Sequence, residues 1–348
     1  MKRRNTRQII TGNVGIGSDH PISIQSMLNV EAHDFENSCA QAKRLEAAGC
    51  EIIRAAVPDI AAVPLIEKLR ESVSVPIVAD IHFDYRIAIE CAAAGVDKIR
   101  INPGNIGSDD RVKAVVKACR ERNIPIRIGV NSGSVEKSIL AKYGSPTAQA
   151  LCESALYHAS LLEKFDFYDI VLSMKSSNVM TMIEAYREAA ARCSYPLHLG
   201  VTEAGTERMG TIKGAVGIGA LLSEGIGDTM RISLTADPEK EVAVAKDILF
   251  AAGIRERAQL ISCPTCGRTK IDLIPIAEKI QNAISDIEKP IKVAVMGCAV
   301  NGPGEAREAD IGIAGGDGCA LIFKKGEIIR KVSEEDIISE LLKEIELL

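Results

Sequence analysis

One strand–helix–strand unit of the chain lies in residues 98–131, which read KIRINPGNIGSDDRVKAVVKACRERNIPIRIGVN. Residues 98–102 and 126–130 are short runs rich in isoleucine, and residues 109–122 between them place apolar side chains three and four positions apart. The first pattern predicts strands and the second an amphipathic helix. Strands joined by a helical crossover lie parallel, so this stretch predicts a parallel α/β sheet.

The same cycle occurs eight times between residues 20 and 252. The predicted strands are residues 22–25, 51–57, 76–80, 98–102, 126–130, 169–173, 197–202 and 230–234. Helices predicted between and after them include residues 37–48, 109–122, 147–164, 178–193, 214–224 and 238–252. Eight such units in about 235 residues match a closed (β/α)8 barrel of the TIM type.

A doubly wound sheet is the alternative architecture. It would carry a glycine-rich phosphate turn directly after its first strand. Here Gly12, Gly15 and Gly17 come before the first predicted strand. We therefore interpret these glycines as a loop and favour the barrel.

The amino-acid composition limits the classes of protein to which the chain can belong. The 348 residues have room for two domains, and 47% hydrophobic with only 3% aromatic residues predicts aliphatic cores. The net charge of −5 offers no global basic field, so we expect no nucleic-acid partner. No apolar run approaches the roughly 18 residues of a membrane span, and no signal-peptide core follows the basic N-terminus. We predict a cytoplasmic protein without a membrane segment.

Polar side chains gather at or just beyond the carboxyl ends of the predicted strands, where TIM barrels place their working residues. They are Arg54, Asp80, His82, Arg100, Asn102, Asn105, Arg127, Asn131, Ser173, Lys175, His198, Thr202, Glu203, Arg231 and Ser233.

Five of these residues are cations in or next to short apolar strands: Arg54, Arg100, Arg127, Lys175 and Arg231. Buried cations are costly unless an anion meets them. Each could pair with a nearby carboxylate such as Asp80, Glu203 or Asp228. Five cations converging on one barrel mouth instead favour a polyanionic ligand, a diphosphate, because Arg binds phosphate through two N–H groups.

A different pattern begins near Gly253, and we predict domains at residues 1–254 and 255–348. The second domain is expected to hold a strand before Cys263, a helix over residues 272–287 and a last helix starting at Ser333. Further strands are predicted at residues 291–296, 310–314, 319–324 and 327–331. This is a compact α+β domain.

Ten cysteines need explaining. Six of them are interpreted as small buried hydrophobic residues in a reducing cell: Cys39, Cys50, Cys91, Cys119, Cys152 and Cys193. Cys263 and Cys266 form a Cys-x2-Cys pair, and Cys298 follows 32 residues later. The pair is compatible with half a zinc site, a thioredoxin-like redox pair or an iron–sulfur cluster. Because this domain has no histidine, a zinc site would need Cys319 as its fourth ligand.

The loop Asn301-Gly302-Pro303-Gly304-Glu305 favours the cluster. Glycines let the backbone approach, and amide groups can donate to cluster sulfides. Glu305 lies seven residues after Cys298. The tight turn between them can bring its carboxylate back to the metal centre held by the cysteines, where it would be an exchangeable ligand. The alternative is that Glu305 is a solvated loop residue.

These motifs resemble those of the bacterial 4-hydroxy-3-methylbut-2-enyl diphosphate synthases of the methylerythritol phosphate pathway. The motifs that carry the resemblance are CPTCGR from Cys263, GCAVNGPGE from Gly297, IRINPGN from Ile99 and GVTEAG from Gly200. The similarity covers essentially the whole chain, which resembles the short two-domain type of the family.

The resemblance implies an oxidoreductase with a (β/α)8 barrel followed by a small domain similar to those of sulfite and nitrite reductases. It implies one [4Fe–4S] cluster per subunit, held by Cys263, Cys266, Cys298 and Glu305, which leaves Cys319 as a bystander. The implied substrate is 2-C-methyl-D-erythritol 2,4-cyclodiphosphate, opened and dehydrated by two electrons from flavodoxin or ferredoxin. The family is homodimeric, with the cluster domain of one subunit closing over the barrel of the other.

Residue roles follow from the same resemblance. The cyclic diphosphate would be held by Arg54, Arg100, Arg127, Asn131, Lys175, Thr202, Arg231, Ser233 and Asn301. Glu203 would handle a proton near the substrate, and Glu305 would be the exchangeable ligand at the reacting iron. Two other hypotheses stay open: a barrel enzyme acting on a phosphorylated sugar with a structural zinc module, and a non-enzymatic protein that senses redox state or iron.

Overall fold

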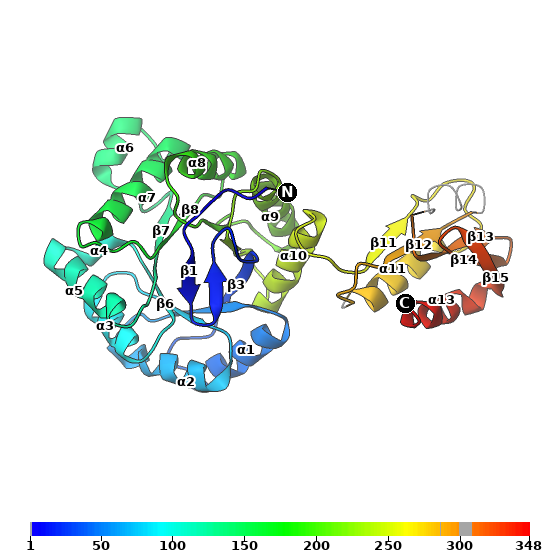
Figure 1. The fold of residues 1–348 in the computed structure, drawn as a ribbon, viewed down its shortest axis with the longest axis horizontal. Helices are drawn as coiled ribbons and strands as arrows, with labels where there is room; N and C mark the ends of the chain where they lie inside the picture. The colour runs from blue at the N-terminus through cyan, green and yellow to red at the C-terminus, as the bar shows by residue number, and fades with distance from the viewer. Residues whose placement is uncertain (1, 286, 299–307) are drawn as a thin grey trace. The chain divides into compact units, whose positions relative to one another are not determined.

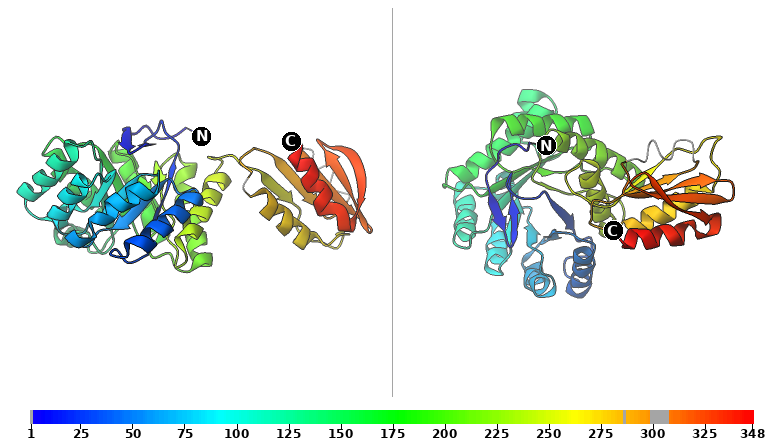
Figure 2. Two further views of the ribbon diagram at one scale, coloured as in Figure 1. Left: turned by 90° about the horizontal axis from the view of Figure 1, so that it is seen from below. Right: turned by 45° about the vertical axis from the view of Figure 1, so that its right-hand side comes forward.

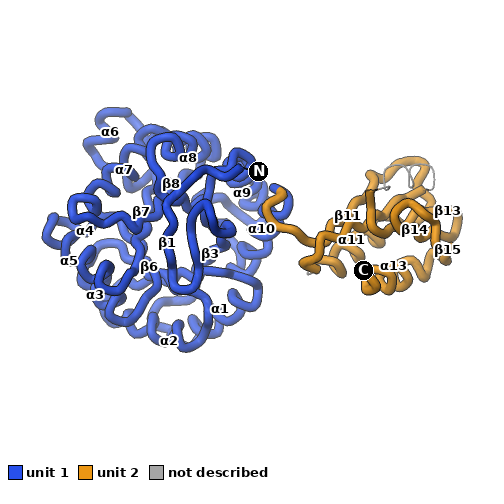
Figure 3. Tube along the Cα trace, in the orientation of Figure 1, with its two compact units in different colours: residues 1–252 blue, residues 253–348 orange. Residues whose placement is uncertain are grey.

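The structure is a computed structural model that describes residues 2–285, 287–298 and 308–348. It divides into two compact units, residues 1–252 and residues 253–348 (Figure 3). Each unit has its own sheet and its own core.

Unit 1 is built on an eight-stranded sheet in the order β8-β7-β6-β5-β4-β3-β10-β9. The strands are β3 (Ser23–Met27), β4 (Ile52–Ala56), β5 (Ile77–Asp80), β6 (Lys98–Ile101), β7 (Ile126–Asn131), β8 (Ile170–Lys175), β9 (His198–Leu199) and β10 (Thr229–Met230). All neighbouring strands pair in parallel. A parallel bridge between Leu172 and Leu197 joins the two edges, and Leu172 N donates to Pro196 O at 2.9 Å. The predicted (β/α)8 barrel is therefore confirmed.

Helices surround the strands in a ring (Figure 1). The long ones are α1 (Phe35–Ala47), α2 (Pro64–Ser72), α3 (Tyr85–Ala93), α5 (Asp109–Arg120), α7 (Ala148–Glu163), α8 (Val179–Arg192), α9 (Glu207–Ser223) and α10 (Pro238–Ala251). Shorter ones are η1 (Ile60–Ala62), α4 (Pro103–Ile106) and α6 (Lys137–Tyr143). Side chains that accept a backbone N–H define several helix starts, as at Asp34, Asp84, Thr147 and Asn178.

Helix α9 begins at Glu207, seven residues before the predicted start at residue 214. The glycines inside it argue against a helix on propensity alone. They are used for close packing: a Cβ on Gly214 would lie 3.3 Å from Ile232, and one on Gly217 would lie 2.6 Å from Met182. Tertiary packing thus outweighs propensity in this segment.

Strands β9 and β10 are shorter than the predicted runs 197–202 and 230–234. Beyond Leu199 the backbone leaves the ladder, and Thr202 N donates to Ser176 O at 3.3 Å. Beyond Met230, Thr235 N donates to Gly205 O at 3.0 Å. The residues after these two strands therefore form loops at the carboxyl end of the barrel.

A hairpin at the N-terminus covers the other end of the barrel. It consists of β1 (Ile9–Thr11) and β2 (Val14–Ile16), with Gly12 at its turn at a φ of 55°. Ile9 and Ile16 pack on Ile52, Val78 and Val171, which lie near the amino ends of their strands. The prediction that the glycine-rich segment is only a loop was wrong, since Gly15 lies in β2. With the amino end sealed, the carboxyl end is the open mouth.

Unit 2 contains a five-stranded sheet in the order β11-β12-β13-β14-β15. The strands are β11 (Gln259–Ser262), β12 (Lys292–Met296), β13 (Ile311–Gly316), β14 (Cys319–Lys324) and β15 (Glu327–Ser333). The first three are parallel and the last two antiparallel. Helices α11 (Leu273–Ile284) and α13 (Ile337–Glu346), the latter preceded by η2 (Glu334–Asp336), pack on one face around Val295, Ile313 and Ile322 (Figure 2).

The opposite face of this sheet has a second small core of Ala294, Met296, Ala314 and Phe323. Cys263 packs against both this core and the larger one. Among the described residues, no helix has the length and apolar character needed to cross a membrane.

Candidate active site

Asp80 organises one side of the barrel mouth. It ends β5 and is 2% exposed. Its carboxylate accepts from Arg54 Nη2 at 2.7 Å and from Arg100 Nη1 at 3.0 Å, and His82 Nε2 lies 3.3 Å away. Burial alone would raise the pKa of Asp80, but Arg54, His82 and Arg100 hold that pKa well below its usual range. One buried carboxylate thus fixes two of the five predicted cations.

Arg127 and Lys175 lie in the same mouth without such a partner. Arg127 is 1% exposed, and its Nε and Nη2 have no hydrogen-bond partner within the described ranges. Lys175, at the end of β8, forms no ion pair with any described residue. Burial, and then the charge of neighbouring arginines, lowers the pKa of both groups well below their ordinary values. These two side chains need an anion that the described protein does not supply.

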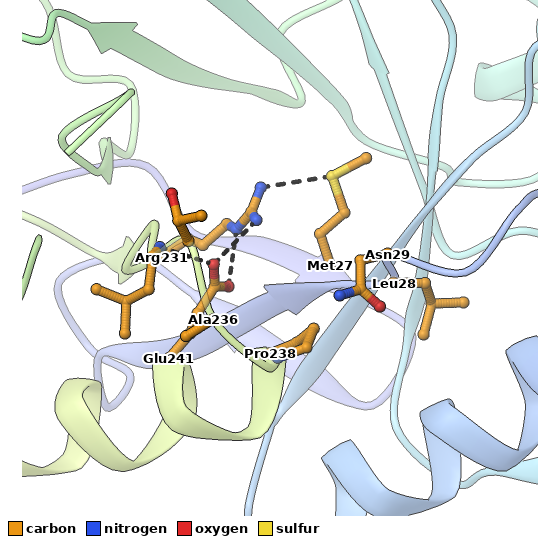
Figure 4. A pocket seen from close by; sticks show the side chains of 9 residues that line it. Met27, Leu28, Asn29, Arg231, Ala236, Pro238 and Glu241 are labelled. Atoms are coloured by element: carbon orange, nitrogen blue, oxygen red, sulfur yellow. Dashed lines mark hydrogen bonds and ion pairs between the residues drawn. The ribbon is translucent and has the colours of Figure 1, made fainter. Parts of the chain in front are cut away.

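Arg231 is held by a different carboxylate, Glu241 of α10. Arg231 Nε lies 3.2 Å from Glu241 Oε2, and Nη2 lies 3.2 Å from Oε1 (Figure 4). Both side chains line a cavity of about 550 Å³ together with Met27, Leu28, Asn29, Leu234, Thr235, Ala236 and Pro238. The mouth therefore has two carboxylates, Asp80 and Glu241, that together hold three arginines.

Two further titratable residues lie inside the barrel. Lys98 and His198 are both fully buried, and the Lys98 Nζ and His198 Nε2 atoms have no described partner. Burial, reinforced by Arg127, lowers the pKa of Lys98 to about 7. Burial and the same arginine lower the pKa of His198 well below its usual value, so its imidazole is neutral at neutral pH. The barrel interior thus carries a strong positive potential.

Glu203 lies in the loop after β9 and has an exposed side chain. Its φ of 51° is in the left-handed region, which a residue with a Cβ adopts at a cost of about 1–2 kcal/mol. The loop is fixed by Thr202 N, which donates to Ser176 O, and by a bridge between Thr206 and Thr235. A strained backbone at a carboxylate on the mouth is typical of a functional residue.

The remaining predicted mouth residues also follow strand ends. Asn131 ends β7, and its Oδ1 accepts from Gly133 N at 3.1 Å, which shapes the turn after the strand. Thr202 and Ser233 follow β9 and β10 and are half-buried. Among the described residues, these three side chains form no hydrogen bond with the five cations, so their substrate-binding role stays a prediction.

The cysteines of unit 2 lie at the carboxyl ends of neighbouring parallel strands. Ser262 of β11 is level with Val295 of β12, so Cys263 and Cys298 follow adjacent strand ends. Gly297 N donates to Cys263 Sγ at 3.3 Å, which ties the two segments together. Cys266 is exposed, and hydrogen bonds from Arg268 lower the pKa of its thiol. Such a thiol is readily converted to the thiolate that binds metal.

These residues fit an iron–sulfur cluster in the chemistry of their donors: three thiols at one sheet edge, one already accepting a backbone N–H. Within residues 2–285, 287–298 and 308–348, no three His, Cys, Asp or Glu side chains converge closely enough for a single metal ion. Cys319, at the start of β14, pairs with Gly316 of β13. The predicted residues Asn301 and Glu305 lie outside the described residues.

Sequence reasoning missed Glu241 as a residue of the mouth. A signal was present: the buried positions of α10 include Pro238, Val242 and Ala245, and Glu241 falls at the same helical phase. A carboxylate in an apolar stripe points to a buried cation nearby. Lys98 could have been found in the same way, as a charged residue at the start of a fully buried strand.

The fold and this site define a TIM-barrel protein with a polycationic mouth and an additional small cysteine-bearing unit. The chain belongs to the GcpE family. The family's GcpE TIM-barrel domain matches residues 6–246, and the GcpE protein C-terminal domain matches residues 259–347.

Curated relatives match the chain over almost its full length. A protein of Clostridium perfringens is 60% identical over 347 residues, covering 99% of each chain. One of Caldanaerobacter subterraneus is 59% identical over 345 residues, covering 99% of this chain and 97% of the relative. Both are named 4-hydroxy-3-methylbut-2-en-1-yl diphosphate synthase (flavodoxin).

Solved structures support the barrel alone. Dihydropteroate synthase from Stenotrophomonas maltophilia superposes with a TM-score of 0.53 at 14% identity, over 71% of this chain and 97% of that one. N-acetylneuraminic acid synthetase from Leptospira borgpetersenii gives 0.52 at 12% identity, over 81% and 99%.

Proposed function

We propose that this protein is a 4-hydroxy-3-methylbut-2-en-1-yl diphosphate synthase that acts on 2-C-methyl-D-erythritol 2,4-cyclodiphosphate. Two electrons and two protons enter, the ring opens and one water leaves. The observation that carries the proposal is the group of five cations, of which Arg127 and Lys175 form no ion pair with a described residue and feel Asp80 and Glu241 only from a distance. Full-length relatives named for this activity support the same assignment.

The barrel binds the diphosphate. Arg127 and Lys175 meet the phosphates directly, while Arg54, Arg100 and Arg231 are oriented by Asp80 and Glu241. Cations fixed in advance stabilise charge on the freed phosphate without reorganising in the transition state. Asn131, Thr202, Ser233 and Asn301 add hydrogen bonds to the ligand.

Glu203 transfers a proton near the C3 oxygen of the substrate. Its loop holds the backbone in the left-handed region and keeps the carboxylate exposed at the mouth. Proton transfer by a positioned carboxylate contributes about 10²–10⁴-fold in rate.

A [4Fe–4S] cluster, one per chain, would be held by Cys263, Cys266, Cys298 and Glu305. When bound, the cluster supplies single-electron transfer and an iron with an exchangeable ligand, Glu305. What supports the set is that Cys263 and Cys298 follow adjacent strand ends, together with the lowered pKa of Cys266.

Flavodoxin is the proposed donor, in line with the names of the relatives, and ferredoxin is the alternative. The proposed assembly is a cytoplasmic homodimer in which the active site is shared between subunits. Sedimentation of the anaerobic protein at micromolar concentration should show a dimer, and a monomer that turns over at full rate would contradict the shared site.

The cofactor is tested by metal and sulfide analysis after anaerobic purification. We expect brown protein with four iron and four sulfide per chain, and Cys263→Ser should abolish cluster assembly. Cys319→Ser is the matched control and should keep full iron content. Colourless protein containing zinc would contradict the proposal and favour the structural-zinc alternative.

A further inference from the structure

Glu241 is a carboxylate in an unusual place. It projects from the buried face of α10 and is 3% exposed. Its neighbours on that face are Pro238, Val242 and Ala245, so the position is otherwise apolar. A carboxylate there is costly unless its oxygens are fully hydrogen-bonded.

Both oxygens of Glu241 are fully used. Oε2 accepts from Ser26 Oγ at 2.9 Å and from Arg231 Nε at 3.2 Å. Oε1 accepts from Leu234 N at 3.1 Å and from Arg231 Nη2 at 3.2 Å. The carboxylate thus joins β3, α10 and the loop after β10 at one point (Figure 4).

Arg231 is left with one uncommitted end. Its Nη1 lies 3.4 Å from Met27 Sδ, and a thioether sulfur is only a weak acceptor. The side chain is 18% exposed and lines the 550 Å³ cavity. Because the guanidinium is planar, fixing its Nε–Nη2 edge also fixes the direction of the Nη1 end.

Other cations lie near Arg231. Its positive charge lowers the pKa of both Arg54 and Lys175, after the larger effect of burial. Glu241 is the carboxylate that opposes this repulsion at Arg231, as Asp80 does for Arg54 and Arg100.

We propose that Glu241 is a positioning residue that clamps one edge of Arg231 so that its Nη1 end meets a phosphate of the substrate. This inference rests on the proposed function. It assigns a role to a residue that does not itself touch the ligand.

The direction in which Glu241→Gln changes anion binding separates the positioning role of Glu241 from a simple charge effect. If Glu241 were only a nearby negative charge, Glu241→Gln would make the mouth more positive and strengthen anion binding. If Glu241 positions Arg231, the same change weakens binding, because the amide nitrogen cannot accept from the arginine N–H groups.

The experiment is calorimetric titration of the anaerobic full-length protein with inorganic pyrophosphate. We expect Glu241→Gln to raise the Kd about tenfold, the scale of one lost charged hydrogen bond. Glu239→Gln is the matched control: Glu239 also lies on α10 but pairs with Arg44 at the surface, and its loss should leave the Kd unchanged. In an Arg231→Ala background, Glu241→Gln should have no further effect.

A steady-state assay adds a second readout. Glu241→Gln should lower kcat/KM mainly by raising KM, with unchanged iron content and far-UV spectrum. Should that variant unfold, Glu241→Asp keeps the charge but moves it by one methylene, and it should also weaken pyrophosphate binding.

Four results would overturn the inference. Unchanged or tighter pyrophosphate binding by Glu241→Gln would exclude positioning, as would an equal loss of binding in the Arg231→Ala background. If the wild type turns over substrate and Glu241→Gln has the same kcat/KM, this inference is wrong but the proposed function stands. A wild-type protein that binds no pyrophosphate defeats the proposed function as well.

Discussion

Gly200 lies directly against Lys175: a Cβ on residue 200 would lie 2.8 Å from Lys175 Nζ and 3.0 Å from Arg231 O. The missing side chain after β9 leaves the space through which the lysine reaches the mouth. The absence of a methyl group therefore helps to determine where the Lys175 ammonium group lies.

Replacing this glycine tests the position of Lys175. Gly200→Ala should raise KM by about tenfold to a hundredfold, because the methyl group displaces Nζ by a fraction of an ångström to an ångström. The measurement is steady-state kinetics of the holoenzyme. Gly219→Ala is the control: nothing lies within 4 Å of its added Cβ, and alanine in helix α9 should stabilise by up to about 1 kcal/mol without changing KM. Equal effects of both variants would show that Lys175 is not constrained by Gly200.

Asp80 should make stability depend on pH. Its pKa in the fold is held well below the value of about 3.9 for an unfolded chain, so its contribution is complete above about pH 5 and is lost as pH falls through the folded pKa. Asp80→Asn should lower the free energy of unfolding by about 3 kcal/mol at pH 7, since it leaves Arg54 and Arg100 without their counter-ion. The difference in the free energy of unfolding between the wild type and Asp80→Asn should become smaller below pH 4. A gap that is constant from pH 3 to pH 7 in urea unfolding would contradict this.

Lys98 should also make stability rise with pH, but in the neutral to alkaline range. Its folded pKa of about 7 lies below the unfolded value of about 10.4, so between these values the unfolded chain binds the extra proton. Stability of the wild type should therefore rise with pH across this window. Lys98→Met removes the buried amine and should be more stable than wild type at pH 7, with the difference narrowing toward pH 10. Parallel pH dependences of the two proteins, from urea unfolding, would refute the buried neutral lysine.

Glu203 should show a conflict between stability and activity. Glu203→Gln should reduce kcat by about 10²–10⁴-fold with the cluster intact, because the amide cannot transfer the proton. Glu203→Gly should lose activity as well but gain about 0.5–1 kcal/mol of stability, since glycine adopts a φ of 51° without strain. Thermal unfolding and kcat of the two variants measure both effects. Normal turnover by Glu203→Gln would remove Glu203 from the mechanism.

Much of the barrel could be predicted because short apolar runs and amphipathic helical segments alternate eight times along the chain. Arg54 and Arg100 fall on the same inward phase as Asp80, and the structure joins all three. The partners of the cations were harder to foresee. Asp228 was considered as a partner at the mouth, but it precedes β10 and binds Arg3 at 2.8 Å instead. Glu241 was missed because its contact depends on how a helix and two strands pack, which periodicity does not specify.

Sequence patterns also failed to predict two features elsewhere in the chain. The hairpin β1–β2 was interpreted as a loop because its glycines hide a short strand signal, and only packing of Ile9 and Ile16 on the barrel end reveals it. Helix α9 begins earlier than predicted, and its glycines allow close contact with Ile232 and Met182, which periodicity does not reveal. In both cases tertiary contacts outweighed local preference.

The most direct test of the central claim is one anaerobic incubation followed by phosphorus NMR. The holoenzyme, reduced flavodoxin and 2-C-methyl-D-erythritol 2,4-cyclodiphosphate should lose the cyclic diphosphate signals and gain those of a linear diphosphate, 4-hydroxy-3-methylbut-2-en-1-yl diphosphate. Two electrons should be consumed per product. An unchanged cyclic diphosphate, with a fully assembled cluster and reduced donor present, would contradict the account.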